Sequence, residues 1–506
     1  MVSKSFRPWA PTFLLLILLL QGGQSKTSLG TTWNDRIKDI LVSITAKIPP
    51  IEGIPIGEIV STLLKIFWPE SEVDIWSLIK DQVEHLVDKK ILEFELQERQ
   101  NEIRALQKTM EMYVEAQVRE KGSLMSSMIH ASNELFYKLT QSSNKPQLIP
   151  LLVTHSAQHL IILKERLLHG KEMYEEDNSK IWKSDLESQI KLYKDSFTSG
   201  YSAWIEWRKG RIIVDVGVHT YPMPVPPFFR WEPYGRVHDE ITGHEHKFFY
   251  TPIVGPNEPN FFKTICETVK KNLFSIQNGQ MLQLLVTTFY LDNFVPGKED
   301  DPSVIPPSMA TATFGPISPG IQMAFSERYV IYSPGNDNNN YGEITDVYVW
   351  EWNQIDGLQF FYERGSGWFS GKSGGGFKHE VSVANKHIKS LKVCINNCNV
   401  IELTIGFSNG ESTGRLGNRG SWVVECTETG GIDTYGLYNV RKVGGGCGSG
   451  LYQIELDYKA YPTKPSQIDS YKSHLIDDSA LKYRSTRDVN KIRCCRETMP
   501  YMSTIE

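Results

Sequence analysis

The segment from Leu148 to Leu168 is apolar around nearly its whole circumference when it is drawn as a helix. Such a helix lies at the centre of a bundle or in a membrane, because a surface helix keeps one polar face. About 20 helical residues also span roughly 30 Å, the thickness of a bilayer's hydrocarbon core. We therefore expect a central helix that can insert into a membrane, through Leu151, Leu152, His155, Gln158, His159, Leu160 and Leu163.

Three polar residues interrupt this apolar surface, namely His155, Gln158 and His159. Buried polar side chains in proteins are usually hydrogen-bonded, which predicts partners on the neighbouring helices. The alternative is that the two histidines sense pH or line a pore, since imidazole titrates close to neutral pH. The sequence leaves both interpretations open.

The residues around this segment also indicate helices, from about Trp33 to Lys209. Between Leu78 and Tyr113 the apolar residues recur at steps of three and four, and the stripe is broken near residues 97–101. This pattern predicts one or two long amphipathic helices. Lys145-Pro146 separates them from the apolar segment. We expect a helical bundle over residues 26–210.

The sequence pattern changes at Phe314: from there on, glycines cluster and apolar residues alternate with polar ones. Period-two strands are predicted at residues 346–352, 358–362, 388–393 and 400–407, which indicates a β sandwich, barrel or prism. The fold class is therefore α+β and multidomain, with a helical bundle before an all-β domain at 314–461. The tail at 462–506 has mixed charge and is expected to be peripheral.

The region between these two domains, residues 211–313, gives a weaker signal and its fold is left open. Arg211 to Val218 indicates a strand, and Asn260 to Leu291 indicates a helix that Gly279 interrupts. The short motif His244-Glu245-His246 lacks the spacing that places two imidazoles on one helix face, so a solvated loop is expected there rather than a metal site.

The first 25 residues have the three parts of a secretory signal peptide: a basic start, an apolar run from Phe13 to Leu20, and small residues for cleavage. We therefore expect a secreted, extracellular protein. Loss of this segment removes Lys4 and Arg7 and changes the formal charge from −5 to −7. A mildly acidic chain argues against nucleic acid as a partner.

Seven cysteines are present, and all but Cys266 follow residue 390. In an exported protein the later ones are candidates for disulfides, with the pairing left open. Cys394-x-x-x-Cys398 has no matching pair nearby, so no metal ion is expected. We also find no nucleophile, dyad or cofactor motif, and expect neither a catalytic residue nor a cofactor. The disulfide candidates are Cys394, Cys398, Cys426, Cys447, Cys494 and Cys495.

Several separated motifs in the helical half resemble the N-terminal domain of the three-domain bacterial crystal toxins, the delta-endotoxins. They cover about residues 35–205 and occur in the family's order: Phe67 to Glu70, Gln82 to Ile91, Tyr113 to Ala116, Leu148 to Leu152 and Ala157 to Leu163. The last two resemble the family's central hydrophobic helix. The resemblance implies an α-helical bundle that inserts into membranes and forms pores.

A second set of motifs resembles jacalin-like lectins over about residues 314–461, which implies a β-prism of three sheets around one core. The set includes Phe314-Gly315-Pro316, Ile355 to Gln359 and Ile401 to Phe407. In that family a glycine-rich loop ends in an aspartate that binds sugar, whereas the loop here, with Gly448 and Ser449, has Tyr452 at that position. A phenol lacks the paired acceptors of a carboxylate, so weak sugar recognition is expected at this loop.

These observations predict a secreted toxin-like protein with two working parts. The β-prism would bind a surface glycan or protein receptor, and the bundle would insert into membrane lipid. The expected partners also include further copies of the chain, in a homo-oligomer. The alternative is a non-lytic extracellular protein, a matrix component or a defence lectin, that retains the same scaffold.

Overall fold

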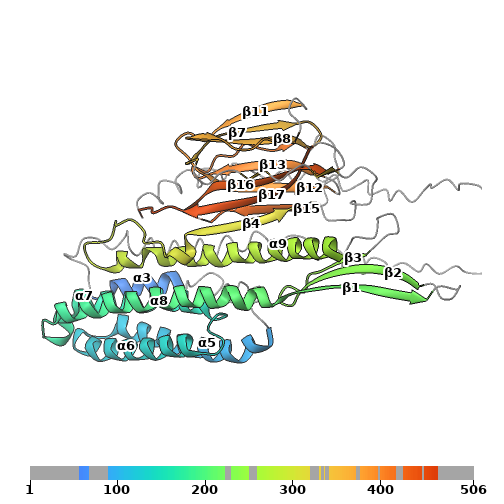
Figure 1. Cartoon of the computed structure of the whole chain (residues 1–506). Helices are drawn as coiled ribbons and strands as arrows, with labels where there is room; N and C mark the ends of the chain where they lie inside the picture. The colour runs from blue at the N-terminus through green and yellow to red at the C-terminus, as the bar shows by residue number, and fades with distance from the viewer. Residues whose placement is uncertain are drawn as a thin grey trace, which may run out of the picture.

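The computed structural model describes twelve stretches of the chain. They are residues 56–67, 89–222, 229–249, 259–318, 330–331, 335–336, 341–371, 376–396, 399–417, 425–432, 434–446 and 450–464. Figure 1 shows three tiers: a helical bundle, one long helix lying alongside it, and a β domain above that helix. The predicted fold class, a helical domain followed by a domain rich in antiparallel strands, is confirmed.

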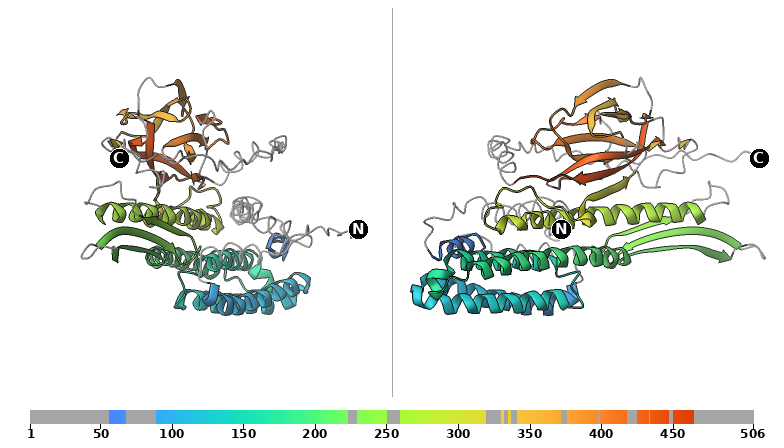
Figure 2. Two further views of the ribbon diagram at one scale, coloured as in Figure 1. Left: turned by 90° about the vertical axis from the view of Figure 1, so that its right-hand side faces the viewer. Right: turned by 60° about the vertical axis from the view of Figure 1, so that its left-hand side comes forward.

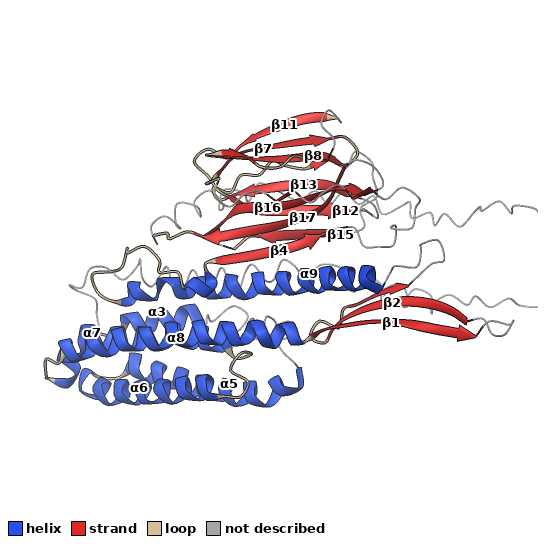
Figure 3. Cartoon of the chain, in the orientation of Figure 1, coloured by secondary structure: helices blue, strands red, loops and turns tan. Residues whose placement is uncertain are grey.

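The bundle consists of α3 (Glu58–Phe67), α5 (Lys89–Glu115), α6 (Val118–Gln141), α7 (Ile149–Tyr174) and α8 (Ser179–Gly210). Pro150 occupies the first turn of α7, where a missing backbone N–H costs nothing. The connection that contains Lys145 and Pro146 separates α6 from α7, as predicted. Figure 3 shows these helices, which belong to the described residues, and the β elements that follow them.

The buried stripe is interrupted at residues 97–101, as predicted, but the helix is not: of the one or two helices predicted, a single helix, α5, runs through these residues. Polar side chains there lie on the outside of the bundle, where they do not end a helix. The chain breaks instead at Gln117, whose backbone is extended, with φ −67° and ψ 151°, and α6 begins at the next residue.

Residues 211–313, whose fold the sequence left open, form a small sheet and a long helix. The strands β1 (Ile212–Pro222), β2 (Phe229–Asp239) and β3 (Glu245–Phe249) pair antiparallel in the order β1-β2-β3. β1 follows α8 directly, and the β1–β2 ribbon extends beyond the ends of α8 and α9 (Figure 1). The helix α9 (Pro259–Leu285) continues into the 3-10 helix η1 (Val286–Phe294), and η2 (Pro307–Met309) follows.

Gly279 does not interrupt α9, contrary to the expectation. The reason for glycine here is close packing: a Cβ atom at Gly279 would lie 2.5 Å from the ring of Phe314. Phe314 belongs to the first strand of the β domain, so the absent side chain lets α9 approach that domain. Figure 2 shows α9 between the bundle and the β domain in both views.

The β domain contains three antiparallel sheets, as a β-prism requires. The first has the order β10-β8-β7-β11, with β9 beside β8: β7 (Ile344–Glu351), β8 (Ile355–Tyr362), β9 (Gly365–Ser366), β10 (Ser370–Gly371) and β11 (Phe377–Ser382). The second has the order β14-β13-β12-β15: β12 (Ile388–Ile395), β13 (Val400–Phe407), β14 (Leu416–Gly417) and β15 (Glu425–Gly430).

The third sheet has the order β4-β17-β16-β5, with β6 beside β16: β4 (Thr311–Ile317), β5 (Val330–Ile331), β6 (Gly335–Asn336), β16 (Tyr435–Gly446) and β17 (Gly450–Ala460). Alternate residues of the long strands point into the space between the sheets. Val347, Leu403 and Leu456, one from each sheet, are fully buried there. A single apolar cluster runs from the bundle through α9 into the prism.

Candidate functional site

The central helix α7 is surrounded by protein on all sides, as its apolar circumference predicts. Every residue from Ile149 to Glu165 is buried, and Leu151, Leu160 and Ile161 have no exposed surface. α7 packs against α6 and α8 and approaches α3 (Figure 1). None of the helices among the described residues is both long enough and apolar enough to cross a membrane.

The three polar residues of α7 meet the neighbouring helices, but their polar atoms are only partly bonded. The Nε2 atom of His155 lies 2.8 Å from the carbonyl oxygen of Ser132 in α6. The Nδ1 atom of His159 lies 3.1 Å from the hydroxyl of Tyr193 in α8. The two imidazole rings are stacked, with centroids 5.7 Å apart. The predicted contacts inside the bundle are therefore present for both histidines.

Other polar atoms of these three residues have no hydrogen-bond partner among the described residues. They are both side-chain amide atoms of Gln158, the Nδ1 atom of His155 and the Nε2 atom of His159. A buried polar atom without a partner costs about 1–3 kcal/mol relative to one exposed to water. The centre of the bundle therefore contains groups that would gain hydrogen bonds if the helices separated.

The environment of the two histidines favours their neutral forms. Burial lowers the pKa of His155 to about 4, opposed by its contact with the Ser132 carbonyl and by the negative charge of Glu102. Burial also lowers the pKa of His159 well below its usual value, and the charges of His155 and Arg166 act in the same direction. Neither imidazole contacts a carboxylate that would hold a proton on it.

A second buried polar cluster lies at the other end of the buried part of α7. The Oε1 atom of Glu165 accepts hydrogen bonds from the Gly57 amide, at 2.5 Å, and from the Tyr113 hydroxyl, at 3.0 Å. Burial raises the pKa of this carboxyl to about 7, although both hydrogen bonds and the ammonium of Lys121 act against the rise. Lys121 donates to the backbone carbonyls of Tyr113 and Val114. This cluster joins α7 to the segment that begins α3.

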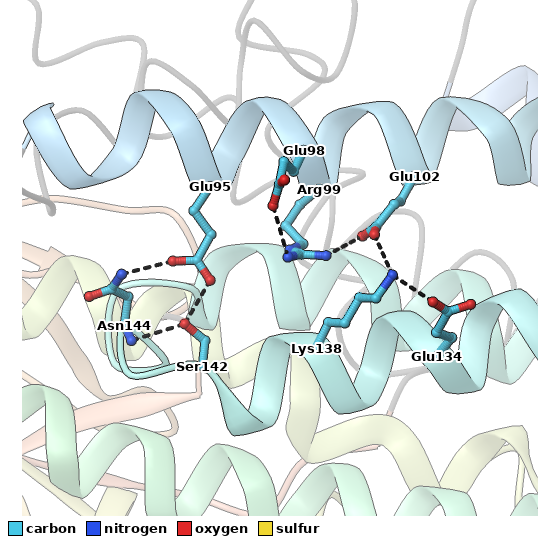
Figure 4. A network of polar contacts seen from close by, with 8 residues as sticks. All are labelled: Glu95, Glu98, Arg99, Glu102, Glu134, Lys138, Ser142 and Asn144. Carbon is cyan, nitrogen blue, oxygen red and sulfur yellow. Dashed lines mark hydrogen bonds and ion pairs between the residues drawn. The ribbon is translucent and has the colours of Figure 1, made fainter.

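A polar network at the edge of the bundle, partly buried and partly exposed, ties the outer helix α5 to α6 and to the connection after it (Figure 4). Glu102 accepts from Arg99 at 2.6 Å and from Lys138 of α6 at 2.7 Å. Further along, Glu95 of α5 accepts from the Ser142 hydroxyl and the Asn144 amide, at 2.6 and 2.8 Å. Exposed ion pairs contribute little each, so this network orients α5 on α6 more than it stabilises the bundle.

Sequence reasoning missed the ion pair that joins the bundle to the sheet after it. The guanidinium of Arg208 in α8 bonds the carboxylate of Asp239 in β2 at 2.5 Å and also donates to Gln277 in α9. Arg208 and Asp239 are both fully buried. The partners lie 31 and 69 residues from Arg208 in sequence, so no local pattern could have revealed the contact.

The candidate sugar loop is described only at its far end. Gly448 and Ser449 lie outside the described residues, whereas Tyr452 is half-buried in β17. The structure pairs Cys394 with Cys426, which are direct neighbours in the register of β12 and β15. Cys266 is a free, buried thiol in α9. The other disulfide candidates, Cys398, Cys447, Cys494 and Cys495, lie outside the described residues, as does the predicted signal peptide.

A solvated loop was expected at the motif His244-Glu245-His246. His244 does lie in the connection between β2 and β3, but Glu245 and His246 belong to a strand. Glu245 and His246 begin β3 and pair with His238 and Val237 of β2. The carboxylate of Glu245 lies 2.5 Å from Arg236 on the neighbouring strand and 2.6 Å from Lys247. No group of three or more His, Cys, Asp or Glu side chains that could hold a metal ion occurs in the described stretches.

Comparisons with known proteins agree with this architecture. Residues 48–206 match the family model of the delta endotoxin N-terminal domain. The insecticidal delta-endotoxin Cry8Ea1 of Bacillus thuringiensis aligns with a TM-score of 0.52 at 11% identity, over 85% of this chain and 73% of that chain. The insecticidal crystal protein Cry7Ca1 of the same organism aligns with a TM-score of 0.52 at 12% identity, over 86% and 75%.

A lectin structure, the prostate-specific glycoprotein lectin WGA16, aligns over 28% of this chain and 96% of that chain, at 17% identity and a TM-score of 0.23. No curated protein sequence matches the chain. Residues 48–206 thus resemble the delta endotoxin N-terminal domain, and over most of its length the protein has the fold of the Bacillus thuringiensis crystal toxins.

Proposed function

We propose that the protein is exported and acts on membranes as a toxin, with the prism docking on a surface glycan or protein and the bundle opening to bring α7 into contact with lipid. The observation that carries this proposal is the complete burial of Ile149 to Leu163 inside a delta-endotoxin N-terminal domain. A helix that is apolar on every side can exchange protein neighbours for acyl chains. The signal-like N-terminal sequence supports export.

The physical cost of this exchange is moderate for the apolar residues, because acyl chains are about as apolar as leucine side chains. The polar residues His155, Gln158 and His159 would need shelter, since ionisable groups in a membrane face other helices or water. Insertion as a group of helices, within one chain or a homo-oligomer, provides that shelter. The proposal involves no catalytic step, metal ion or cofactor.

One observation favours the alternative, a non-lytic extracellular matrix or defence lectin protein. The buried part of α7 includes Lys164 and Glu165, which are 1% and 0% exposed. Charged residues are expensive in a membrane, so they shorten the stretch that can enter lipid without penalty. In this alternative α7 serves only as the core of a bundle, and the prism alone has a binding function.

Dye release from liposomes separates the two functions. The test protein is residues 26–506, with and without proteolytic trimming, at several pH values and lipid compositions. We expect release that Leu160→Asp abolishes and that Leu192→Asp, at a half-exposed position of α8, leaves intact. Circular dichroism must show that both variants fold, because an aspartate in the core is itself costly. If the wild-type protein releases no dye under any condition, the non-lytic function replaces this one.

A further inference from the structure

A row of aromatic side chains lies on the outer face of the prism's first sheet. Tyr348, Trp350 and Trp352 alternate along β7 and its end, so they project from one face of the strand. The intervening residues Val347 and Val349 are fully buried in the prism core. The row therefore faces away from the core, on the sheet that lies farthest from the helices (Figure 1).

Neighbouring rings fix the orientation of each member of this row. The ring of Tyr348 lies 4.4 Å from that of Phe361, measured between centroids, and Trp350 meets Phe369 edge-on at 5.0 Å. Trp352 stacks on Phe377 at 5.3 Å, and each of these two is 49% exposed. Rings that are already held in place lose little conformational entropy when they bind a ligand.

The charges on this face indicate a neutral partner. Lys378 lies 3.8 Å above the centre of the Tyr348 ring and pairs with Glu380 at 2.6 Å. Asp346 adds one further negative charge on the same face of β7. Since the described residues of this face carry no excess of positive charge, they offer no attraction to anionic lipid, nucleic acid or a sulfated polymer.

The combination of ring faces with polar neighbours fits an oligosaccharide. From Tyr348 to Trp352 the row extends about 13 Å, at about 3.3 Å per strand residue, so it matches an extended chain better than one small molecule. Pyranose rings present apolar C–H faces that can stack on aromatic rings. Their hydroxyls can donate to the carboxylate of Glu380 or bond the amide of Gln359. Exposed apolar patches on soluble proteins commonly mark interaction sites.

We propose that this aromatic face, defined as Tyr348, Trp350, Trp352, Phe361 and Phe369, binds a neutral oligosaccharide by ring stacking. The inference rests on the proposed docking of the prism on a surface glycan, and it moves the sugar site from the Tyr452 loop to the outer sheet. Lys378 is exposed on this face and its ion pair is weak, so the side chain can swing off the Tyr348 ring when a ligand binds.

The test is titration of the full-length mature protein with cellotetraose, chitotetraose and mannotetraose, followed by tryptophan fluorescence and calorimetry. We expect at least one of them to bind, and Trp352→Ala to weaken that binding by at least tenfold. Because Trp352 is half-exposed, its removal should leave the fold intact. Tyr137→Ala is the matched control, since it removes an aromatic side chain that is 55% exposed but lies on α6.

Three results would overturn the inference. One is that none of the three oligosaccharides binds, and another is that Trp352→Ala binds as tightly as the wild-type protein while Tyr452→Ala does not. The third is binding of phosphatidylcholine vesicles through Trp352 that no oligosaccharide competes away, which would make the face a lipid contact. Dye release by the bundle is measured separately, so a failed sugar titration with intact release rejects this site and not the toxin function.

Discussion

The bundle and the prism both have well-packed apolar interiors, but they differ in how completely their buried polar groups are hydrogen-bonded. In the prism, the carboxylate of Asp457 accepts from Thr313, Asn439 and Arg441, at 2.6 to 2.7 Å. The prism still has single unpaired atoms, such as the Oδ1 atom of Asn439, whereas in the bundle neither amide atom of Gln158 has a partner among the described residues. The prism also contains the disulfide between Cys394 and Cys426. The difference indicates that the bundle is the part that opens, while the prism keeps its shape.

The largest expected effect comes from the packing of α7. Leu160→Ala should lower the free energy of unfolding of the bundle by about 2–5 kcal/mol, because it leaves a cavity at a fully buried position. Leu192→Ala, at a position of α8 that is 44% exposed, should change it by less than about 0.5 kcal/mol. Urea denaturation followed at 222 nm measures both. A loss under 1 kcal/mol at Leu160 would show that α7 is not the packing centre.

The second effect concerns the prism. Removing the disulfide with Cys394→Ala and Cys426→Ala together should destabilise the prism by about 2–4 kcal/mol, since the bond closes a loop of 32 residues. The helical signal should keep its original denaturation midpoint. A variant whose helices unfold earlier by the same amount would contradict the separate opening of the bundle and would show that the apolar cluster through α9 makes the two parts unfold together.

The sequence predicted the elements whose causes are local. α7 follows from an apolar surface within its own residues, and β12 and β13 follow from their alternation. The pairing of Cys394 with Cys426 depends on the register of β12 and β15, which no local pattern determines. The same holds for Gly279, whose reason is the ring of Phe314 in another tier of the molecule.

The candidate site was predictable to a similar degree. The burial of His155 and His159 follows from the apolar residues around them, whereas their partners, Ser132 and Tyr193, depend on how three helices pack. The burial of Glu165 could not be predicted from the sequence. A glutamate beside Lys164 and Arg166 in sequence resembles the polar end of a surface helix, and only tertiary packing encloses it.

A third prediction uses Glu165, whose pKa is raised to about 7 from about 4.5 in an unfolded chain. Its charged form is disfavoured by the fold, so stability decreases as the pH rises from about 4.5 through 7. Glu165→Gln keeps an acceptor for the Gly57 amide and should make the bundle more stable at pH 8 by about 2–3 kcal/mol, with little change at pH 4.5. An unchanged pH profile between these values would contradict the burial of a charged group here.

The smallest expected effect depends on pH in the opposite direction: stability is lost as the pH falls. The pKa of His155 is lowered to about 4, so its contribution to stability is complete above pH 6.5 and is lost as the pH falls toward 4. At pH 5, His155→Gln should raise the free energy of unfolding above that of the wild-type protein by up to about 2 kcal/mol, after the difference between the two proteins at pH 8 is subtracted. His130→Gln, which removes an exposed imidazole from α6, is the matched control. Thermal unfolding followed at 222 nm at both pH values measures the difference.

Hydrogen exchange of the wild-type mature protein, resolved by peptide at pH 7.5 and pH 5, tests the central claim most directly. The account predicts that Ile149 to Glu165 exchange through an opening of the bundle that leaves β12 and β13 protected, because most of the unpaired buried polar atoms of the described residues lie in the bundle helices. Exchange of α7 only together with the prism strands, at the same rate and at both pH values, would show that the two parts unfold as one and would contradict the claim.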